Sequence, residues 1–250
     1  MSEDHIIVSC EGGVLEIRFN RPAKKNAITN SMYGAMADAL EAGEADPSVR
    51  AILFTSAGDF YTAGNDLMDF AAIASGAAGA APRHVARFLE RIISAEKPIV
   101  AAVRGHAVGV GVTMLLHCDL VYVAEDAALT TPFVDLGLVP EAASSLTIPA
   151  RLGHARAFAI LGLGEPLLGR DAVAVGIANA ALAAAEVEPR ARLAAHALAK
   201  KPAESLRLTK GLMRDRETLL ARMRIESECF AERLQSEEAR AAFAAFLSRR

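Results

Sequence analysis

Backbone N–H groups and one carboxylate are the groups in this 250-residue chain whose spacing points to chemistry. Residues 98–103 have the continuous apolar character of a buried strand, and the small-residue turn 105–111 and an apolar run to Cys118 follow them. A strand that feeds a tight turn opening a helix aims free N–H groups at one point. A second N–H from the segment near Asn65 and the carboxylate of Glu141 complete the set. We therefore predict an active site that joins these groups.

Glu141 follows Pro140 and precedes a small-residue segment, which leaves two interpretations open. It could be a first-turn acid that complements the dipole of a following helix. It could instead be a general base, because apolar neighbours would keep the carboxyl dry and raise its pKa. Those apolar neighbours are Phe133, Leu136, Leu138 and Val139.

Three aspartates offer alternative carboxylates. Asp135 is the best substitute for Glu141 because it lies close in the sequence, although it also flanks a glycine turn and fits a local cap. Asp66 and Asp69 follow the turn near Asn65 and are typical of helix caps.

Other familiar kinds of site are disfavoured. His106 and His117 lack a Ser or Cys partner at a recognisable elbow, so we interpret both as structural. Gly109 and Gly111 follow a predicted strand, but Met114 stands where a dinucleotide-binding loop has its third glycine. The sequence has no P-loop motif and no metal-ligand spacing, so we expect no metal. Three distant cysteines are typical of free thiols in a reducing compartment: Cys10, Cys118 and Cys229.

The elements that must position these groups alternate between strands and helices. Ser31 is the expected cap of the first long helix, which carries apolar residues to Leu40 on one face. The alanine-rich residues 178–185 are the expected hinge before an all-helical tail, in which Pro202 marks a helix start. This alternation indicates an α/β fold. The predicted strands are residues 6–8, 14–19, 49–55, 98–103 and 120–124, and further helices are predicted at 83–95, 154–163 and 169–175.

Composition narrows the class of protein. Apolar residues make up 52% of the chain, yet no run of about 20 residues is continuously apolar, so we predict a soluble protein without a membrane span. The acidic start of the chain resembles neither a signal nor a transit peptide, and we expect a cytoplasmic location. From Arg190 onward, Lys and Arg outnumber Asp and Glu by 14 to 8. Because glutamates alternate with these basic residues, as at 222–226, we predict a solvated helix face and no nucleic-acid partner.

Three blocks of sequence resemble the crotonase (enoyl-CoA hydratase/isomerase) superfamily: RPAKKNA at 21–27, FYTAGNDL at 60–67, and the stretch 97–140. Within it, the chain is most similar to the peroxisomal-type Δ3,Δ2-enoyl-CoA isomerases. This resemblance implies an α/β, crotonase-like spiral of β-β-α turns with a helical C-terminal region. It also implies a spiral core with the acyl-CoA site over 1–188, a helical oligomerisation region over 189–250, and a homotrimer or a dimer of trimers.

The resemblance also assigns roles at the site. The N–H groups of Asn65 and Val110 would form an oxyanion hole for the enolate of a thioester, and Glu141 would be the proton-shuttling base. Hydratases that use two glutamates carry them where this chain has Thr113 and Phe133. Neither side chain can activate water, which disfavours that mechanism.

A coenzyme A thioester is the substrate that the resemblance implies, and no separate cofactor is expected because coenzyme A belongs to the substrate. Ala23, Lys24 and Lys25 would lie beside its nucleotide or pantetheine portion. The remaining substrate-binding positions are Ala63, Gly64, Asp66, Leu67, Gly109, Phe133 and Leu138.

Three functions follow from these assignments. The leading one is a 3-enoyl-CoA to 2-enoyl-CoA isomerase of fatty acid β-oxidation. A hydratase, or another acyl-CoA reaction that uses a carboxylate such as Asp135, is the alternative among enzymes. A non-catalytic acyl-CoA-binding protein is the alternative of another class.

Overall fold

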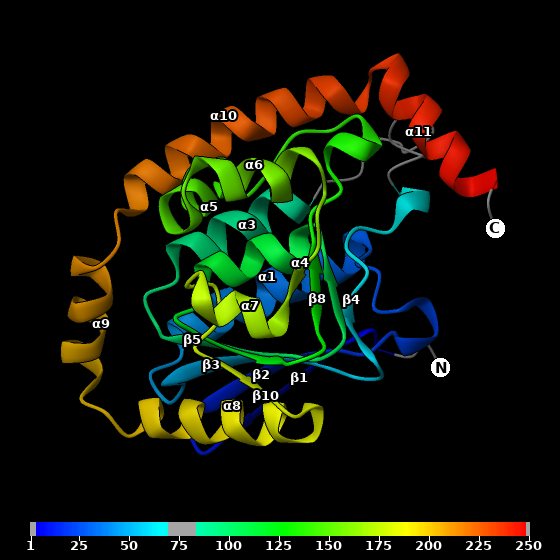
Figure 1. Ribbon diagram of the computed structural model, residues 1–250. Helices are drawn as coiled ribbons and strands as arrows, with labels where there is room; N and C mark the ends of the chain where they lie inside the picture. The colour runs from blue at the N-terminus through cyan, green and yellow to red at the C-terminus, as the bar shows by residue number, and fades with distance from the viewer. Residues whose placement is uncertain (1–3, 70–83, 249–250) are drawn as a thin grey trace.

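Two sheets of unequal size organise the fold of the computed structural model, which describes residues 4–69 and 84–248 (Figure 1). The larger sheet has the strand order β1-β2-β3-β5-β7-β10, and all its neighbours are parallel except β1 and β2. Its strands are β1 (Ile6–Glu11), β2 (Val14–Phe19), β3 (Ala51–Ser56), β5 (Ile99–Val103), β7 (Leu120–Ala124) and β10 (Ala180–Leu182). The smaller sheet, in the order β4-β6-β8-β9, contains β4 (Phe60–Thr62), β6 (His106–Val108), β8 (Ala128–Thr130) and β9 (Leu167–Leu168).

Successive turns of the chain add one strand to each sheet. β3 leads into β4, β5 into β6, and β7 into β8, and a helical segment separates one pair from the next. Every residue of β3 and β5 is buried, which explains why their sequences are continuously apolar rather than alternating. This arrangement confirms the predicted crotonase-like spiral of β-β-α turns.

Helices cover the two faces of the larger sheet. The first face carries α1 (Asn30–Ala45) and α3 (His84–Ser94), which pack on each other, and α8 (Ala184–Ala199) lies against β3, β5 and β7 on the other (Figure 1). The shorter helices are α4 (Val110–Thr113), α5 (Ser144–Leu152), α6 (His154–Gly162) and α7 (Gly169–Ala174), and the 3-10 turns are η1 (Pro22–Lys24), η2 (Met114–His117) and η3 (Val134–Leu136).

Two local predictions were wrong. The side chain of Thr29, not of Ser31, caps α1 by accepting a hydrogen bond from Met32 N at 3.3 Å. The expected hinge at 178–185 contains β10, which pairs in parallel with β7. Alanine-rich sequence has little intrinsic preference for strands, so tertiary pairing decided its conformation. The predicted division into a core of residues 1–188 and a tail of residues 189–250 stays a prediction; residues 188 and 189 both lie in α8.

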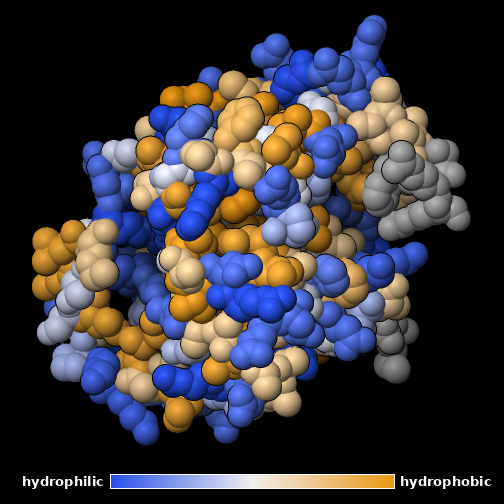
Figure 2. Space-filling view, in the orientation of Figure 1, coloured by the Kyte–Doolittle hydropathy of each residue, from blue (hydrophilic) through white to orange (hydrophobic). Residues whose placement is uncertain are grey.

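The tail beyond α8 consists of α9 (Ala203–Leu212), α10 (Arg216–Leu234) and α11 (Glu237–Ser248), and α10 passes over α5 and α6 (Figure 1). The prediction of a solvated face at 222–226 was wrong for Glu226, which is 5% exposed. Apolar side chains instead reach solvent on α9 (Figure 2). They are Leu208 and Leu212, and the exposed Met213 directly follows the helix.

In the described parts of the chain, none of the helices combines the length and apolar character that crossing a bilayer demands.

Candidate active site

The loop that precedes α1 is fixed by Asn26. This buried asparagine has a left-handed backbone, with φ 54°, and its side chain bonds three backbone groups. Its Oδ1 accepts from Arg21 N, and its Nδ2 donates to the carbonyls of Ala57 and Phe60, all at 2.8 Å. The loop is thereby held against the segment that joins β3 to β4.

The N–H of Asn65 points away from that loop. Asn65 forms an isolated parallel bridge with Ile28, in which Ile28 N donates to Gly64 O at 2.8 Å and Asp66 N donates to Ile28 O at 2.9 Å. The bridge therefore uses the groups on either side of Asn65. Because alternate N–H groups of an extended segment point to opposite sides, the Asn65 N–H is directed away from Ile28.

The second predicted donor, Val110 N–H, lies in the first turn of α4. Gly109 precedes it with φ 56° and ψ −116°, a backbone conformation that residues other than glycine rarely adopt. First-turn N–H groups of a helix have no intrahelical acceptor. Gly111 lets this turn lie directly on β4, since a Cβ at Gly111 would collide with Thr62.

The two donor segments are in direct contact. A Cβ placed on Gly64 would lie 2.8 Å from the carbonyl oxygen of Val108. Gly64 also has φ +81°, so its backbone conformation and its close approach both favour glycine. The structure thus brings the segments of Asn65 and Val110 together, as the sequence predicted.

A cavity of about 490 Å³ opens beside these segments. Eight of the predicted site residues line it: Lys25, Ala63, Gly64, Asn65, Leu67, Gly109, Phe133 and Leu138. Three lining residues come from the C-terminal helices and were missed by sequence reasoning: Phe230, Ala242 and Ala245. The cavity is therefore built from both ends of the chain.

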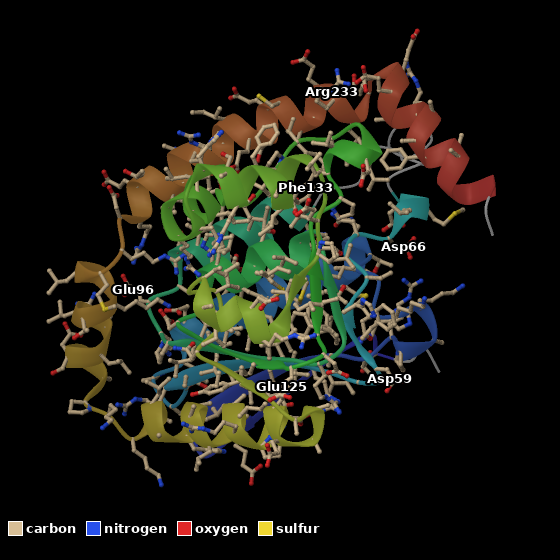
Figure 3. All side chains as sticks on the ribbon, in the orientation of Figure 1. Asp59, Asp66, Glu96, Glu125, Phe133 and Arg233 are labelled. Atoms are coloured by element: carbon tan, nitrogen blue, oxygen red, sulfur yellow. The ribbon has the colours of Figure 1, made fainter. Side chains whose placement is uncertain are left out.

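The corner between α10 and α11 is fixed close to Phe133, which projects beneath α10 (Figure 3). Arg233, near the end of α10, donates to the carbonyl of Gly137 at 3.3 Å and forms an ion pair with Glu238. A Cβ on Gly137 would lie 2.7 Å from Ala239 N, which shows how closely α11 approaches.

Glu141 is buried, with 6% of its surface exposed, and does not itself line the cavity. Within the described residues its Oε1 has no hydrogen-bond partner. Burial, and then the nearby charge of Glu226, raise the pKa of the Glu141 carboxyl to about 8. A carboxyl that is buried, has one oxygen without a hydrogen bond and has a pKa near neutral pH has the properties of a general base.

Tyr33 bonds one of the donor segments and is close enough to this carboxyl to be affected by its charge. Its hydroxyl donates to Asn65 Oδ1 at 2.5 Å. Burial and, to a smaller extent, the charge of Glu141 raise the pKa of Tyr33 well above its ordinary value. Tyr33 therefore bonds Asn65 and lies near enough to Glu141 to be affected by its charge. Its position in α1 gave no sequence signal beyond that of a core aromatic residue.

Five predicted positions lie outside the cavity wall, whereas Lys25 lines it; the five are Glu141, Val110, Ala23, Lys24 and Asp66. Val110 is fully buried behind the wall, and Ala23 and Lys24 are exposed on η1. Asp66 pairs with Arg21 at 2.6 Å and accepts from Met68 N at 3.0 Å, which fits the predicted cap. Lys25 Nζ lies 4.8 Å from the centre of the Phe60 ring at the cavity.

The carboxylates of a two-glutamate hydratase have no counterpart here. Thr113 is buried, and Phe133 packs in the wall. Asp135 is the one acidic side chain among the described residues that line the cavity, but it is exposed to solvent. The described residues contain no group of three or more His, Cys, Asp and Glu side chains arranged to hold a metal ion.

His117 is buried and structural, as predicted. Burial, and then the charge of Arg214, lower its pKa to about 3, so the ring is neutral. Arg214 donates to Nδ1, which leaves the proton on Nε2 to be donated to the carbonyl of Ala142 at 2.7 Å. The ring thus holds the residue that follows Glu141.

Comparisons with known proteins agree with this geometry. Residues 9–250 match the family model described as enoyl-CoA hydratase/isomerase. The chain is 38% identical over 250 residues to enoyl-CoA delta isomerase 2 of Rattus norvegicus, covering 98% of this chain and 64% of that protein. It is 34% identical to the peroxisomal enoyl-CoA delta isomerase 3 of Mus musculus, covering 98% and 78% of the two chains. The solved structure of Pseudomonas aeruginosa OdaA has a TM-score of 0.93 at 42% identity, covering 98% of this chain and 99% of that one.

Proposed function

The chain belongs to the enoyl-CoA hydratase/isomerase family, and we propose that it moves the double bond of a 3-enoyl-CoA to the 2 position with Glu141 as proton shuttle. One observation carries the proposal. Glu141 is a buried carboxyl with a free oxygen and a pKa of about 8, whereas Thr113 and Phe133 stand where two-glutamate hydratases have their carboxylates.

The reaction needs one base and one site for negative charge. The Glu141 carboxylate takes a proton from C2, the electrons of that bond move toward the thioester carbonyl, and an enolate forms. The carboxylic acid then returns the proton at C4 while the double bond shifts to C2, so no atom is gained or lost. N–H groups of Asn65 and Val110 hydrogen-bond the enolate oxygen, and each such donor typically contributes about 3 kcal/mol of barrier lowering.

The raised pKa of Glu141 suits both half-reactions. A carboxylate with an ordinary pKa would be a weak base toward a carbon acid, whereas one with a pKa of about 8 accepts the proton more readily. Near neutral pH the same group also releases the proton readily. Apolar wall residues such as Phe133 and Leu138 keep water from competing for the enolate.

Coenzyme A is the substrate handle in this proposal. Lys25 lies at the cavity and supplies positive charge for phosphate or pantetheine oxygens. Ala63 and Gly64 present backbone along the thioester arm. The names of the rat and mouse relatives support an isomerase, although the chain spans only 64% of the length of the rat protein.

The alternative enzyme reaction uses Asp135. This residue lines the cavity, which favours it over the other aspartates, but its exposure gives it no dry environment. A non-catalytic acyl-CoA-binding protein is the third possibility, since the cavity alone would serve it.

Two substrates and two variants separate these functions. Purified protein is offered 3-enoyl-CoA and 2-enoyl-CoA, and isomerisation and hydration are followed separately. We expect isomerisation of the first, a loss of at least about 100-fold in Glu141→Gln, and retention of most activity in Asp135→Asn. Hydration that survives in Glu141→Gln but is lost in Asp135→Asn would establish the alternative enzyme. Tight binding without turnover of either substrate would establish the binding protein.

The proposals for assembly and location rest on the family resemblance. We propose a homotrimer or a dimer of trimers formed through the helical region 189–250, supported by the exposed Leu208 and Leu212 of α9 and the exposed Met213 that follows it. Light scattering of the purified protein measures the mass, and a monomer would contradict the proposal. A role in fatty acid β-oxidation and a cytoplasmic location stay predictions.

A further inference from the structure

Glu226 is a buried carboxylate that the proposed reaction does not use. It lies in α10, in the part of the tail that crosses α5. Its Oε2 accepts from Ala143 N at 2.5 Å, and its Oε1 accepts from Ser145 N at 2.9 Å. Both carboxylate oxygens are therefore occupied by N–H groups at the start of α5, where a negative charge is favourable. Burial raises the pKa of Glu226, and its bonds to Ser145 and Ala143, followed by the charge of Arg222 one turn earlier in α10, oppose that rise.

The backbone held by Glu226 is strained and directly follows Glu141. Ala142 and Ala143 both have φ 57°, a left-handed conformation that is unfavourable for alanine. Two consecutive residues adopt it only when other contacts hold them. His117 holds this turn at the carbonyl of Ala142, and Glu226 holds it at the N–H of Ala143. The direction of the Glu141 side chain depends on this turn.

The charge of Glu226 also acts on Glu141. Three titratable groups on neighbouring elements interact with Glu141 or with the turn that follows it. They are the neutral Tyr33 of α1, the neutral His117 of η2, and Glu226 of α10. Of these, only Glu226 carries a charge. A second negative charge opposes ionisation of Glu141 and so adds to the effect of burial.

We propose that Glu226 is a positioning residue, which fixes the left-handed turn after Glu141 and sets a negative charge beside the base. The proposal rests on the proposed function of Glu141 as the base. It assigns the tail helix α10 a part in catalysis, although Glu226 touches no reacting atom.

The test measures the titration of Glu141 itself. Protein labelled with carboxyl ¹³C-glutamate is titrated by NMR, and the Glu141 signal is assigned by its absence in Glu141→Gln. Glu226→Gln keeps the size of the side chain and removes its charge. We expect the Glu141 midpoint to fall by about one pH unit, and the pH dependence of kcat/KM for isomerisation to fall with it. Glu228→Gln removes an exposed charge from the same helix and should leave both midpoints unchanged.

The outcomes distinguish this inference from the proposed function. A folded Glu226→Gln protein whose Glu141 midpoint is unchanged overturns the inference, even if isomerisation is observed. A lowered midpoint supports the inference even if the protein turns over no 3-enoyl-CoA, which would overturn only the proposed function. If Glu226→Gln does not fold, the titration is repeated in an Ala143→Gly background, with Ala143→Gly alone as reference. Glycine there removes the φ strain that Glu226 otherwise has to hold.

Discussion

Replacing Glu141 by glutamine should abolish turnover and should raise the free energy of unfolding relative to wild type by an amount that grows with pH, with net stabilisation at high pH. The folded protein keeps the Glu141 proton up to a pH of about 8, whereas the unfolded chain releases it near the ordinary value of 4.5. Between these two pH values unfolding releases a proton, so the free energy of unfolding of the wild type falls as the pH rises.

The magnitude follows from the two pKa values. At about 1.4 kcal/mol for each unit of difference, the ionised carboxyl destabilises the fold by up to about 5 kcal/mol above pH 8. The same relation gives about 3 kcal/mol at pH 7 and about 1 kcal/mol at pH 5. Glutamine removes this pH-dependent loss, although its buried amide adds a constant cost of about 1–3 kcal/mol for unpaired N–H groups.

Urea unfolding at pH 5, 7 and 9 measures the difference directly. We expect the free energy of unfolding of Glu141→Gln, relative to wild type, to rise by about 4 kcal/mol between pH 5 and pH 9. Asp135→Asn, which changes an exposed carboxylate of the cavity wall, should show no such rise. A difference between Glu141→Gln and wild type that is constant across this range would refute the raised pKa, and with it the argument that burial prepares Glu141 as a base.

Three further predictions concern activity and packing. The value of kcat/KM should rise with pH and level off above a pH of about 8, because Glu141 must be ionised to accept a proton; a flat profile between pH 6 and 9 would contradict this. Tyr33→Phe should lower kcat about tenfold with little change in KM, because it leaves Asn65 Oδ1 without its 2.5 Å hydrogen bond; steady-state kinetics with unaltered kcat would show that this bond does not matter. Gly64→Ala should lower the melting temperature by about 6 °C, since an added Cβ meets a backbone oxygen at 2.8 Å and φ is +81°. Gly211→Ala, in α9 with open space around it, is the matched control for calorimetry and should leave the melting temperature unchanged or slightly higher.

Local patterns predicted the α/β class and the core strands, whereas the spiral was implied by the family resemblance. Strands such as β3 and β5 are buried on both faces, so their apolar runs were visible without any knowledge of their partners. Glycines with positive φ and close backbone contacts marked the two donor segments, because few other residues satisfy such positions. The placement of Asn65 beside the Val110 turn could therefore be anticipated from sequence.

The parts of the site that depend on distant contacts could not be anticipated. Glu226 lies in a mixed-charge stretch that resembles a solvated face, and only its bonds to Ala143 and Ser145, 83 and 81 residues away, show its burial. The cap at Thr29 rather than Ser31 was ambiguous because both residue types cap helices. No periodicity of α10 or α11 signalled that Phe230, Ala242 and Ala245 would line the cavity.

The origin of the cavity wall also determines at what stage of protein synthesis the site can be completed. Lys25 leaves the ribosome well before Ala245, yet both line the same cavity. The strands of the spiral can pair as they emerge, since most of their partners are near in sequence. The turn after Glu141 obtains its bond from Glu226 only when α10 has docked. A ribosome-bound chain halted before α10 would hold most of the sheet in place and still lack a finished site, so activity arises late, after most of the fold has formed.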